Sequence, residues 1–221
     1  IYGDAFQTKK ELQEYERLLA EAEKRDHKRL GQELDLFSFH EEGPGFVFWH
    51  PKGMIIRKAL MQLHQELQGA AKYEEVSTPT ILAEDLWRKS GHWDHYKDNM
   101  YFTEIDGKTF AIKPMNCPGT ILIYKNRPHS YRELPIRFAE AGLVHRHEPS
   151  GTLNGLFRVR AFRQDDSHIF VRPDQVNKEV SNIIQLILKF YNIIGFQNTH
   201  IEISTRPAKY IGTLAVWNKA E

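Results

Sequence analysis

The sequence predicts an α+β fold in which a mostly antiparallel sheet is flanked by helices. Segments with strand-like composition come in hairpin-like pairs, and they alternate with segments whose apolar residues recur at helical spacing. The clearest turn is Asp106-Gly107, which separates two runs rich in Phe, Thr and Ile. A chain of 221 residues is long enough for one sizeable domain. We therefore expect a linker helix over residues 1–30 and one core domain over residues 31–221.

The first third of the chain predicts two helices and two strand segments. Residues 8–29 begin with capping-box spacing and continue with apolar residues at helical intervals. A strand is expected at 46–49, and a helix that packs on the sheet is expected from the apolar repeat over 56–67. Residues 73–82 are strand-like, but Pro79 indicates the edge of a sheet, which could face another subunit.

The rest of the chain continues the alternation of hairpins and helices. The expected elements are a hairpin over 101–114, a short helix over 119–125, strands over 135–147 and 157–170, a helix over 176–191 ended by Gly195, and a strand over 199–204. The loop between the two long strands exceeds what a tight hairpin needs, which favours a function for it. The last eight residues resemble the first turns of a helix, so we expect a longer protein.

Polar and aromatic side chains occupy alternate positions in the second long strand. They are Arg158, Arg160, Phe162, Gln164, Asp166 and His168. Because successive side chains of a strand point to opposite faces, all six should share one face, about 33 Å long. A buried structural strand would carry aliphatic residues there, so the pattern indicates a binding surface. An ordinary exposed edge strand is the alternative.

Arg146 and Glu148 stand two apart at the end of the preceding strand and should face Phe162. An arginine can bind a phosphate bidentately, a carboxylate can accept from an exocyclic amine, and a ring can stack on a base. Together the three side chains predict a site for an adenine nucleotide. The alternative is that Arg146 and Glu148 form a surface ion pair of little energetic value.

Cys117 and His168 form a second candidate group, because a thiolate and an imidazole are both good zinc ligands. Two ligands far apart in sequence do not by themselves predict a metal, since a single Cys is usually a small buried hydrophobe and a single His a satisfied polar residue. His92, His145 and His147 can likewise be ordinary polar residues without a metal. A single cysteine also excludes an intrachain disulfide and fits a reducing compartment.

Composition excludes some partners. Thirty basic and twenty-nine acidic residues leave a formal net charge of +1, so no global electrostatic signal favours nucleic acid or a membrane surface, and any RNA contact must be local. No apolar run approaches the roughly 20 residues of a membrane span. The cytoplasm is the expected compartment because the single cysteine fits a reducing environment.

Three stretches of the sequence, residues 113–119, 137–151 and 158–170, are similar to catalytic motifs of class II aminoacyl-tRNA synthetases. Their order and content, together with residues 25–27 and 90–93, resemble the threonyl-tRNA synthetase family over nearly the entire chain. The resemblance implies a class II catalytic core that activates threonine with ATP and transfers it to the 3′ end of threonine tRNA. It also implies Mg²⁺ with ATP, Zn²⁺, a role in protein synthesis, and a homodimer formed through the first motif around Pro79.

The resemblance also implies roles for individual residues. Arg146 would clamp the α-phosphate of ATP, Glu148 would read the adenine amino group, Phe162 would stack on adenine, and Arg158 would reach the outer phosphates. Gln164 and Asp166 would hold the amino and hydroxyl groups of threonine, Cys117 and His168 would be two of three zinc ligands, and His92 would lie near the terminal adenosine of tRNA.

Some parts of the family pattern have no counterpart before Glu221. These are the third zinc ligand, the arginine of the third motif, and the editing and anticodon-binding domains, so this segment alone is expected to be nearly inactive. Thr120 also stands where many relatives have a histidine. Two alternatives remain open: a naturally short, non-catalytic relative that binds an adenine nucleotide or an RNA end, and a dimerisation scaffold with vestigial motifs.

Overall fold

The fold is that of a computed structural model, which describes residues 4–208 and 210–221. The chain forms two compact units, Ile1–Val176 and Asn177–Glu221. The helices of the first unit are α1 (Lys9–Lys24), α2 (His27–Glu33), α3 (Pro51–Ala70), α4 (Glu84–Lys89), α5 (His92–Tyr96) and α6 (Cys117–Lys125). Its strands are β1 (Phe37–Ser38), β2 (Phe48–Trp49), β3 (Glu74–Glu75), β4 (Ile81–Ala83), β5 (Tyr101–Ile105), β6 (Lys108–Ile112), β7 (Ile136–His145) and β8 (Ala161–Phe170).

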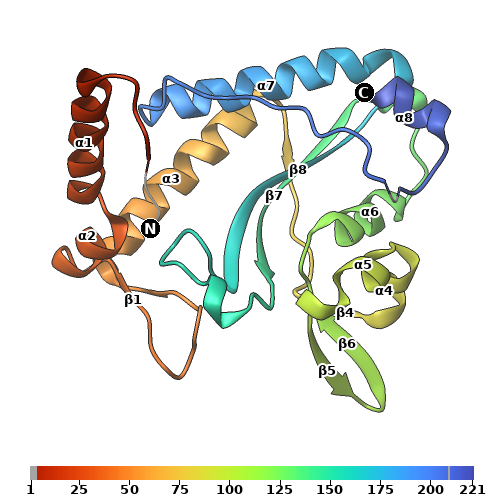
Figure 1. Ribbon diagram of the computed structural model, residues 1–221. Coiled ribbons are helices and arrows are strands. Elements are labelled where there is room, and N and C mark those ends of the chain that lie inside the picture. The colour runs from red at the N-terminus through yellow and green to blue at the C-terminus, as the bar shows by residue number, and fades with distance from the viewer. Residues whose placement is uncertain (1–3, 209) are drawn as a thin grey trace. The chain divides into compact units, whose positions relative to one another are not determined.

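The long β7–β8 hairpin is the framework of the first unit (Figure 1). Its antiparallel register runs from the pair Ile136 and Phe170 to the pair His145 and Ala161, and β3 joins the outer side of β7 in parallel. A second antiparallel sheet has the order β4-β6-β5, and β1 pairs with β2. The prediction of a mostly antiparallel α+β fold is confirmed.

The N-terminal helix is broken where a single helix to Arg29 was expected. Asp26 interrupts it by accepting hydrogen bonds from the backbone N–H groups of Lys28 and Arg29, at 2.7 and 3.1 Å. It thereby becomes the N-cap of a new helix, α2. The expected single helix is therefore wrong, and α2 crosses the boundary that we placed at residue 30.

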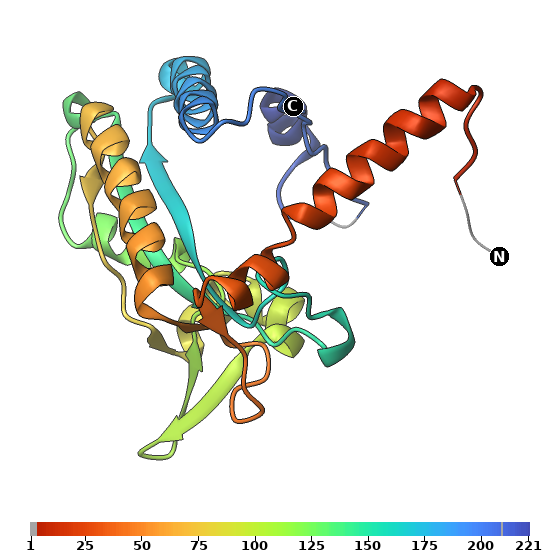
Figure 2. The same ribbon diagram turned by 90° about the vertical axis from the view of Figure 1, so that its left-hand side faces the viewer.

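Helix α3 runs beside the β7–β8 hairpin, as Figures 1 and 2 show. His64 and Gln68 on α3 both hydrogen-bond to Asp165 of β8. Where α3 begins, a side chain on Gly53 would overlap the carbonyl oxygen of Leu36, so a glycine permits this close approach. The predicted helix on the sheet is confirmed.

The strand-like segment around Pro79 divides into two short strands. β3 lies before Pro79 at the edge of the β3-β7-β8 sheet, and β4 lies after it at the edge of the other sheet. The expected edge position is confirmed, although a continuous strand over 73–82 is not formed. The strand expected at 46–49 is likewise reduced to the two residues of β2.

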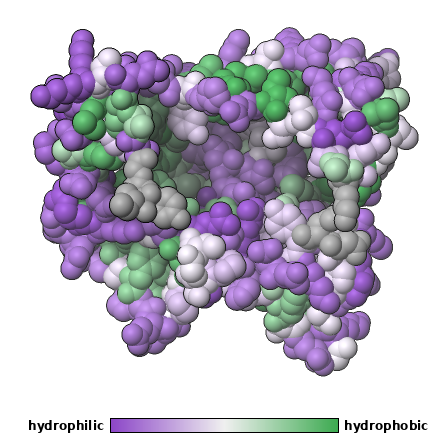
Figure 3. Space-filling model, in the orientation of Figure 1, coloured by the Kyte–Doolittle hydropathy of each residue, from purple (hydrophilic) through white to green (hydrophobic). Residues whose placement is uncertain are grey.

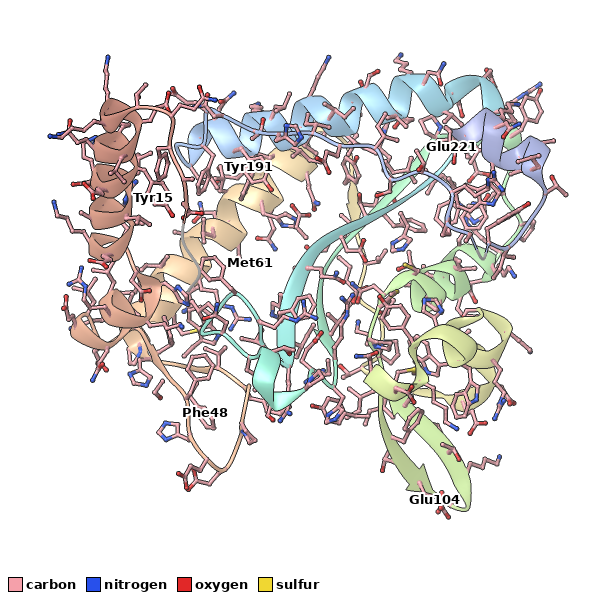
Figure 4. All side chains as sticks on the ribbon, viewed as in Figure 1. Tyr15, Phe48, Met61, Glu104, Tyr191 and Glu221 are labelled. Atoms are coloured by element: carbon pink, nitrogen blue, oxygen red, sulfur yellow. The ribbon has the colours of Figure 1, made fainter. Side chains whose placement is uncertain are left out.

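The hairpin predicted from Asp106-Gly107 is present as β5 and β6. Both turn residues have positive φ, 52° and 72°, as a two-residue turn of the I′ type requires. Glu104 lies near the tip of this hairpin (Figure 4). At its other end, Trp87, Met100 and Ala111 form a small buried apolar cluster.

The second unit contains α8 (Leu214–Ala220) and all of α7 (Val176–Ile193) except its first residue. The long helix is confirmed, and Gly195, with φ of 93°, follows its end. Its exposed apolar side chains recur at helical spacing and give the green stripe along α7 in Figure 3. Residues 199–204 form no strand, so that prediction is wrong. Among the described residues, no helix is long and apolar enough to cross a membrane.

Candidate active site

One face of β8 carries four of the six side chains that the alternating pattern singled out. Phe162, Gln164, Asp166 and His168 occupy alternate positions of the strand and are all half-buried. Asp165, between two of them, points the other way and contacts α3. Phe162 and His168 are six residue steps apart, which corresponds to roughly 20 Å along the strand. The expectation that these side chains share one face of the strand is confirmed over this length.

Arg158 and Arg160 do not belong to the strand, because β8 begins only at Ala161. The backbone N–H of Arg160 donates to the carbonyl of Gly45 at 2.7 Å, and that of Arg158 donates to the carbonyl of Asn154 at 3.3 Å. These bonds hold the chain in the loop before the ladder starts. The expectation of six side chains on one extended strand is therefore wrong at its first two positions.

Cys117, Asp166 and His168 converge at one end of the β8 face. One ligand atom from each residue lies within 4.8 Å of those of the other two. Cys117 is the first residue of α6, so the start of that helix lies against the strand that carries the other two side chains. Burial raises the pKa of the Cys117 thiol, and the nearby charge of Asp166 adds to the effect.

This donor set fits a metal ion. A thiolate, an imidazole and a carboxylate are the groups that bind zinc, and three protein ligands leave an open position for a substrate. Sequence reasoning brought Cys117 and His168 together as ligands, and the structure places them together. It also places the carboxylate of Asp166, which we expected to bind substrate, beside the same two side chains.

Arg146 lies between two aromatic rings. Its guanidinium carbon is 5.2 Å from the ring centroid of Phe162 and 5.9 Å from that of Tyr96, and its Nε donates to the carbonyl of Pro114 at 3.3 Å. The predicted contact between Arg146 and Phe162 is therefore present. The bond to Pro114 holds the arginine next to the segment that leads to Cys117.

Glu148 is paired with Arg158 rather than with Arg146. Nη2 and Nε of Arg158 donate to Oε2 of Glu148 at 2.7 and 3.0 Å, and Nε of Arg160 donates to its carbonyl oxygen at 3.0 Å. Glu148 is buried, whereas the Arg158 side chain is largely exposed. Two residues expected to contact ATP thus hold each other in this structure. The alternative of an Arg146–Glu148 surface pair receives no support.

His92 is the first residue of α5, and it contacts the segment that precedes Cys117. Its Nε2 lies 3.1 Å from the sulfur of Met115, and its Nδ1 hydrogen-bonds with the Ser90 hydroxyl at 2.8 Å. Burial lowers the pKa of His92 and outweighs the opposing effect of Ser90. The imidazole is therefore neutral at pH 7 and can accept a proton.

A buried ion pair supports the site and was missed by sequence reasoning. Nζ of Lys113 donates to Oε1 of Glu140 at 2.9 Å and to the hydroxyl of Thr78 at 2.7 Å, and that hydroxyl donates to Oε2 of Glu140 at 2.9 Å. The three residues come from the segment before Pro79, from the end of β6 and from β7. No local sequence pattern signals such a network, because its members are far apart in sequence.

His27 is a second residue whose contacts were missed. Its Nε2 accepts a hydrogen bond of 2.9 Å from the backbone N–H of Leu156, and its ring packs edge-on against Phe157 at 4.6 Å between centroids. A side chain on Gly155 would overlap this imidazole. The first residue of α2 therefore holds the loop that leads from Glu148 to Arg158.

Comparison with known proteins identifies the fold and its motifs. Residues 101–218, more than half of the chain, match the tRNA synthetase class II core domain (G, H, P, S and T). The chain belongs to this family. The matched residues include β5 to β8, α6 and the candidate metal-binding residues Cys117, Asp166 and His168. The resemblance found in the sequence motifs is thus confirmed at the level of the family.

Among relatives of this class II core, threonine–tRNA ligases are closely similar. The one from Clostridium acetobutylicum is 56% identical over 220 residues, which make up 100% of this chain and 34% of that protein. The one from Carboxydothermus hydrogenoformans is 58% identical over 220 residues with the same coverage. The chain thus spans about a third of the length of the curated relatives it matches.

A solved structure agrees with the class II assignment. The RNA binding domain of threonyl-tRNA synthetase from Cryptosporidium parvum Iowa II superimposes with a TM-score of 0.80 at 40% identity. The superposition covers 89% of this chain and 49% of that chain. The similarity therefore extends to the three-dimensional arrangement as well as to the sequence.

Proposed function

We propose that this chain is the threonine-activating core of a threonine–tRNA ligase. The observation that carries the proposal is the convergence of Cys117, Asp166 and His168 on the β8 face that also carries Phe162, with Arg146 over that ring. A metal-binding group at one end and a nucleotide-binding group at the other suit a reaction that joins a small amino acid to ATP. Identities of 56% and 58% to threonine–tRNA ligases support the same reaction.

The nucleotide end would bind ATP together with Mg²⁺. Phe162 offers a ring on which adenine can stack, Glu148 offers an acceptor for the adenine amino group, and Arg146 and Arg158 offer guanidinium groups for the phosphates. As the threonine carboxylate attacks the α-phosphorus, Arg146 stabilises the charge that grows on the phosphoryl oxygens. Arg158 must leave Glu148 to reach the outer phosphates, so ATP would replace that ion pair.

The metal end would select threonine. Threonine and valine have nearly the same shape, and an apolar pocket separates such isosteres by only about 10². Zinc held by Cys117 and His168 would offer an open position to the amino group and hydroxyl of threonine, and valine lacks that hydroxyl. Gln164 would bind the amino group, and Asp166 would accept from the hydroxyl. Serine would still fit, which is why an editing step is needed.

His92 would serve the transfer of threonine to tRNA. Its lowered pKa keeps the imidazole neutral, so it can accept a proton as the terminal hydroxyl of tRNA attacks the adenylate. We further propose a homodimer through the edge segment around Pro79, a linker helix over 1–30 and a core domain over 31–221. A reducing compartment, the cytoplasm, suits a site that needs the Cys117 sulfur free.

The test is threonine-dependent exchange of pyrophosphate into ATP by the full-length gene product. We expect exchange with threonine and none above background with valine. Cys117→Ala should raise the KM for threonine far more than the KM for ATP, because the cysteine lies at the amino-acid end of β8. Equal effects on both KM values would count against a metal role, and absence of exchange in the wild type would favour a non-catalytic relative.

A further inference from the structure

Asn116 occupies the N-cap of α6 but does not cap the helix. An asparagine at this position ordinarily accepts a hydrogen bond from a backbone N–H of the first turn. The Asn116 side chain makes no such bond, although it is completely buried. Instead its Nδ2 donates to Oδ2 of Asp166 at 2.9 Å. The Asn116 backbone is already in the helical region, with φ of −91° and ψ of −24°, so its side chain points to the candidate site and not to the first turn.

The oxygen of the Asn116 amide is buried without a hydrogen bond to any residue that the structure describes, which costs stability. Oδ1 of Asn116 is buried and has no hydrogen-bond partner among the described residues. An unpaired buried acceptor destabilises a fold, so a purely structural residue would not be expected here. Turning the amide over would not help, because Oδ1 would then face the Asp166 carboxylate. The bond to Asp166 therefore sets the orientation of the amide.

Gly142 on β7 leaves room for this arrangement. A side chain there would overlap the amide of Asn116, and Gly142 pairs with Gln164 of β8. The hairpin thus lacks a side chain at the point where Asn116 reaches over it towards Asp166. The backbone of Asn116 is also held, because its carbonyl accepts from the N–H of Thr120 at 3.1 Å and from its hydroxyl at 3.3 Å.

We propose that Asn116 is a positioning residue that orients the Asp166 carboxylate for recognition of a substrate hydroxyl. The inference rests on the proposed function, since it concerns how the same site selects its amino acid. Asn116 occupies Oδ2 of Asp166, so the other carboxylate oxygen remains for the ligand. A carboxylate oxygen is an acceptor for the hydrogen bond that a β-hydroxyl group donates.

Asn116→Ser in the full-length gene product separates this role from a structural one. Serine keeps a side-chain oxygen at the start of α6, but it is too short to keep the same reach to Asp166. We expect a cooperative melting transition, a KM for threonine raised about 10- to 100-fold, as for other residues that orient a metal-site ligand, and a KM for ATP changed less than about 2-fold.

A second variant and a control complete the test. Asn116→Asp keeps the shape and the capping oxygen but places a second carboxylate against Asp166, so it should raise the KM for threonine at least as much. Asn126→Ser is the matched control, because Asn126 is an exposed asparagine at the other end of α6 and should change neither KM. Co²⁺ titration of each variant should still give the thiolate absorption band of Cys117.

The outcomes distinguish this inference from the proposed function. Absence of threonine-dependent exchange in the wild type would overturn the proposed function. Exchange in the wild type with an unchanged threonine KM in both Asn116 variants would overturn only the positioning role. Equal increases in both KM values, or failure of both variants to fold, would also overturn it, because each outcome indicates a structural residue.

Discussion

At the residue scale, the site depends on side chains whose surroundings change their chemistry. Burial lowers the pKa values of His92 and His145 and raises that of Cys117. Nδ1 of His145 is also buried without a hydrogen-bond partner in the described part of the chain. Such histidines resist protonation in the folded state, so the free energy of unfolding depends on pH.

The lowered pKa values predict an acid-sensitive fold. The folded chain binds these two protons more weakly than the unfolded chain, so their contribution to stability is present above the ordinary histidine pKa of about 6.5 and is lost as the pH falls below it. The free energy of unfolding in urea should therefore fall between roughly pH 7 and pH 5. In His92→Gln/His145→Gln the fall should be shallower, whereas an unchanged slope would contradict the prediction.

Sequence patterns reached some of these residues and not others. The period of two along β8 placed Phe162, Gln164, Asp166 and His168 on one face, because strand geometry alone dictates that alternation. Asn116 was not singled out from the sequence, and its bond to Asp166 depends on how α6 packs against β8. A local pattern cannot report such a contact, since the two residues meet only after folding.

At the scale of elements, the Lys113–Glu140–Thr78 network joins segments that position the site. Lys113 precedes the segment that carries Asn116 and Cys117, and Glu140 lies on β7 beside β8. The Lys113 carbonyl also accepts from the N–H of His145 at 3.0 Å. Both charged side chains are almost completely buried, so each needs the other.

Lys113→Met should strongly destabilise the protein, because it leaves the Glu140 carboxylate buried without its cation. The expected loss is about 3–5 kcal/mol of unfolding free energy. Lys113→Met/Glu140→Leu should recover much of it, since no uncompensated charge remains. Urea unfolding measures both values. Arg17→Met, which breaks an exposed ion pair with Glu14 on α1, is the control and should have little effect.

His27 connects α2 to the loop between Glu148 and Arg158. His27→Ala removes the acceptor for the N–H of Leu156, so hydrogen exchange at residues 154–158 should become faster. His27→Gln retains a side-chain acceptor and should restore part of the protection. Mass spectrometry of exchanged peptides measures this change. Unaltered exchange in His27→Ala would mean that the loop does not depend on α2.

At the scale of the whole molecule, we expect the interface of a homodimer at the edge segment around Pro79. β3 and β4 lie at the edges of two different sheets, and β4 exposes Ile81 with 45% of its surface accessible. Edge strands with free backbone groups can pair with another chain. The proposed homodimer uses this edge.

Ile81→Glu should weaken the homodimer, because a charge at a subunit interface loses its water on association. Sedimentation of the full-length gene product should show a dimer whose dissociation constant rises by at least about tenfold in this variant. Ile105→Glu is the matched control, since Ile105 is equally exposed at 45% but lies at the tip of the β5–β6 hairpin. Equal effects of the two substitutions would argue against the edge segment as the interface.

Sequence by itself determined the α+β class, the β5–β6 hairpin, the alternating face of β8 and the candidate metal-binding side chains Cys117 and His168. These features follow from local rules, namely turn geometry, side-chain periodicity and donor chemistry. Only the tertiary structure decided where β8 begins, that residues 199–204 form no strand, and that Asn116, Asp166 and Cys117 meet. The reason is physical: a strand needs a partner, and a site needs packing between segments far apart in the chain, and neither is encoded within one local stretch.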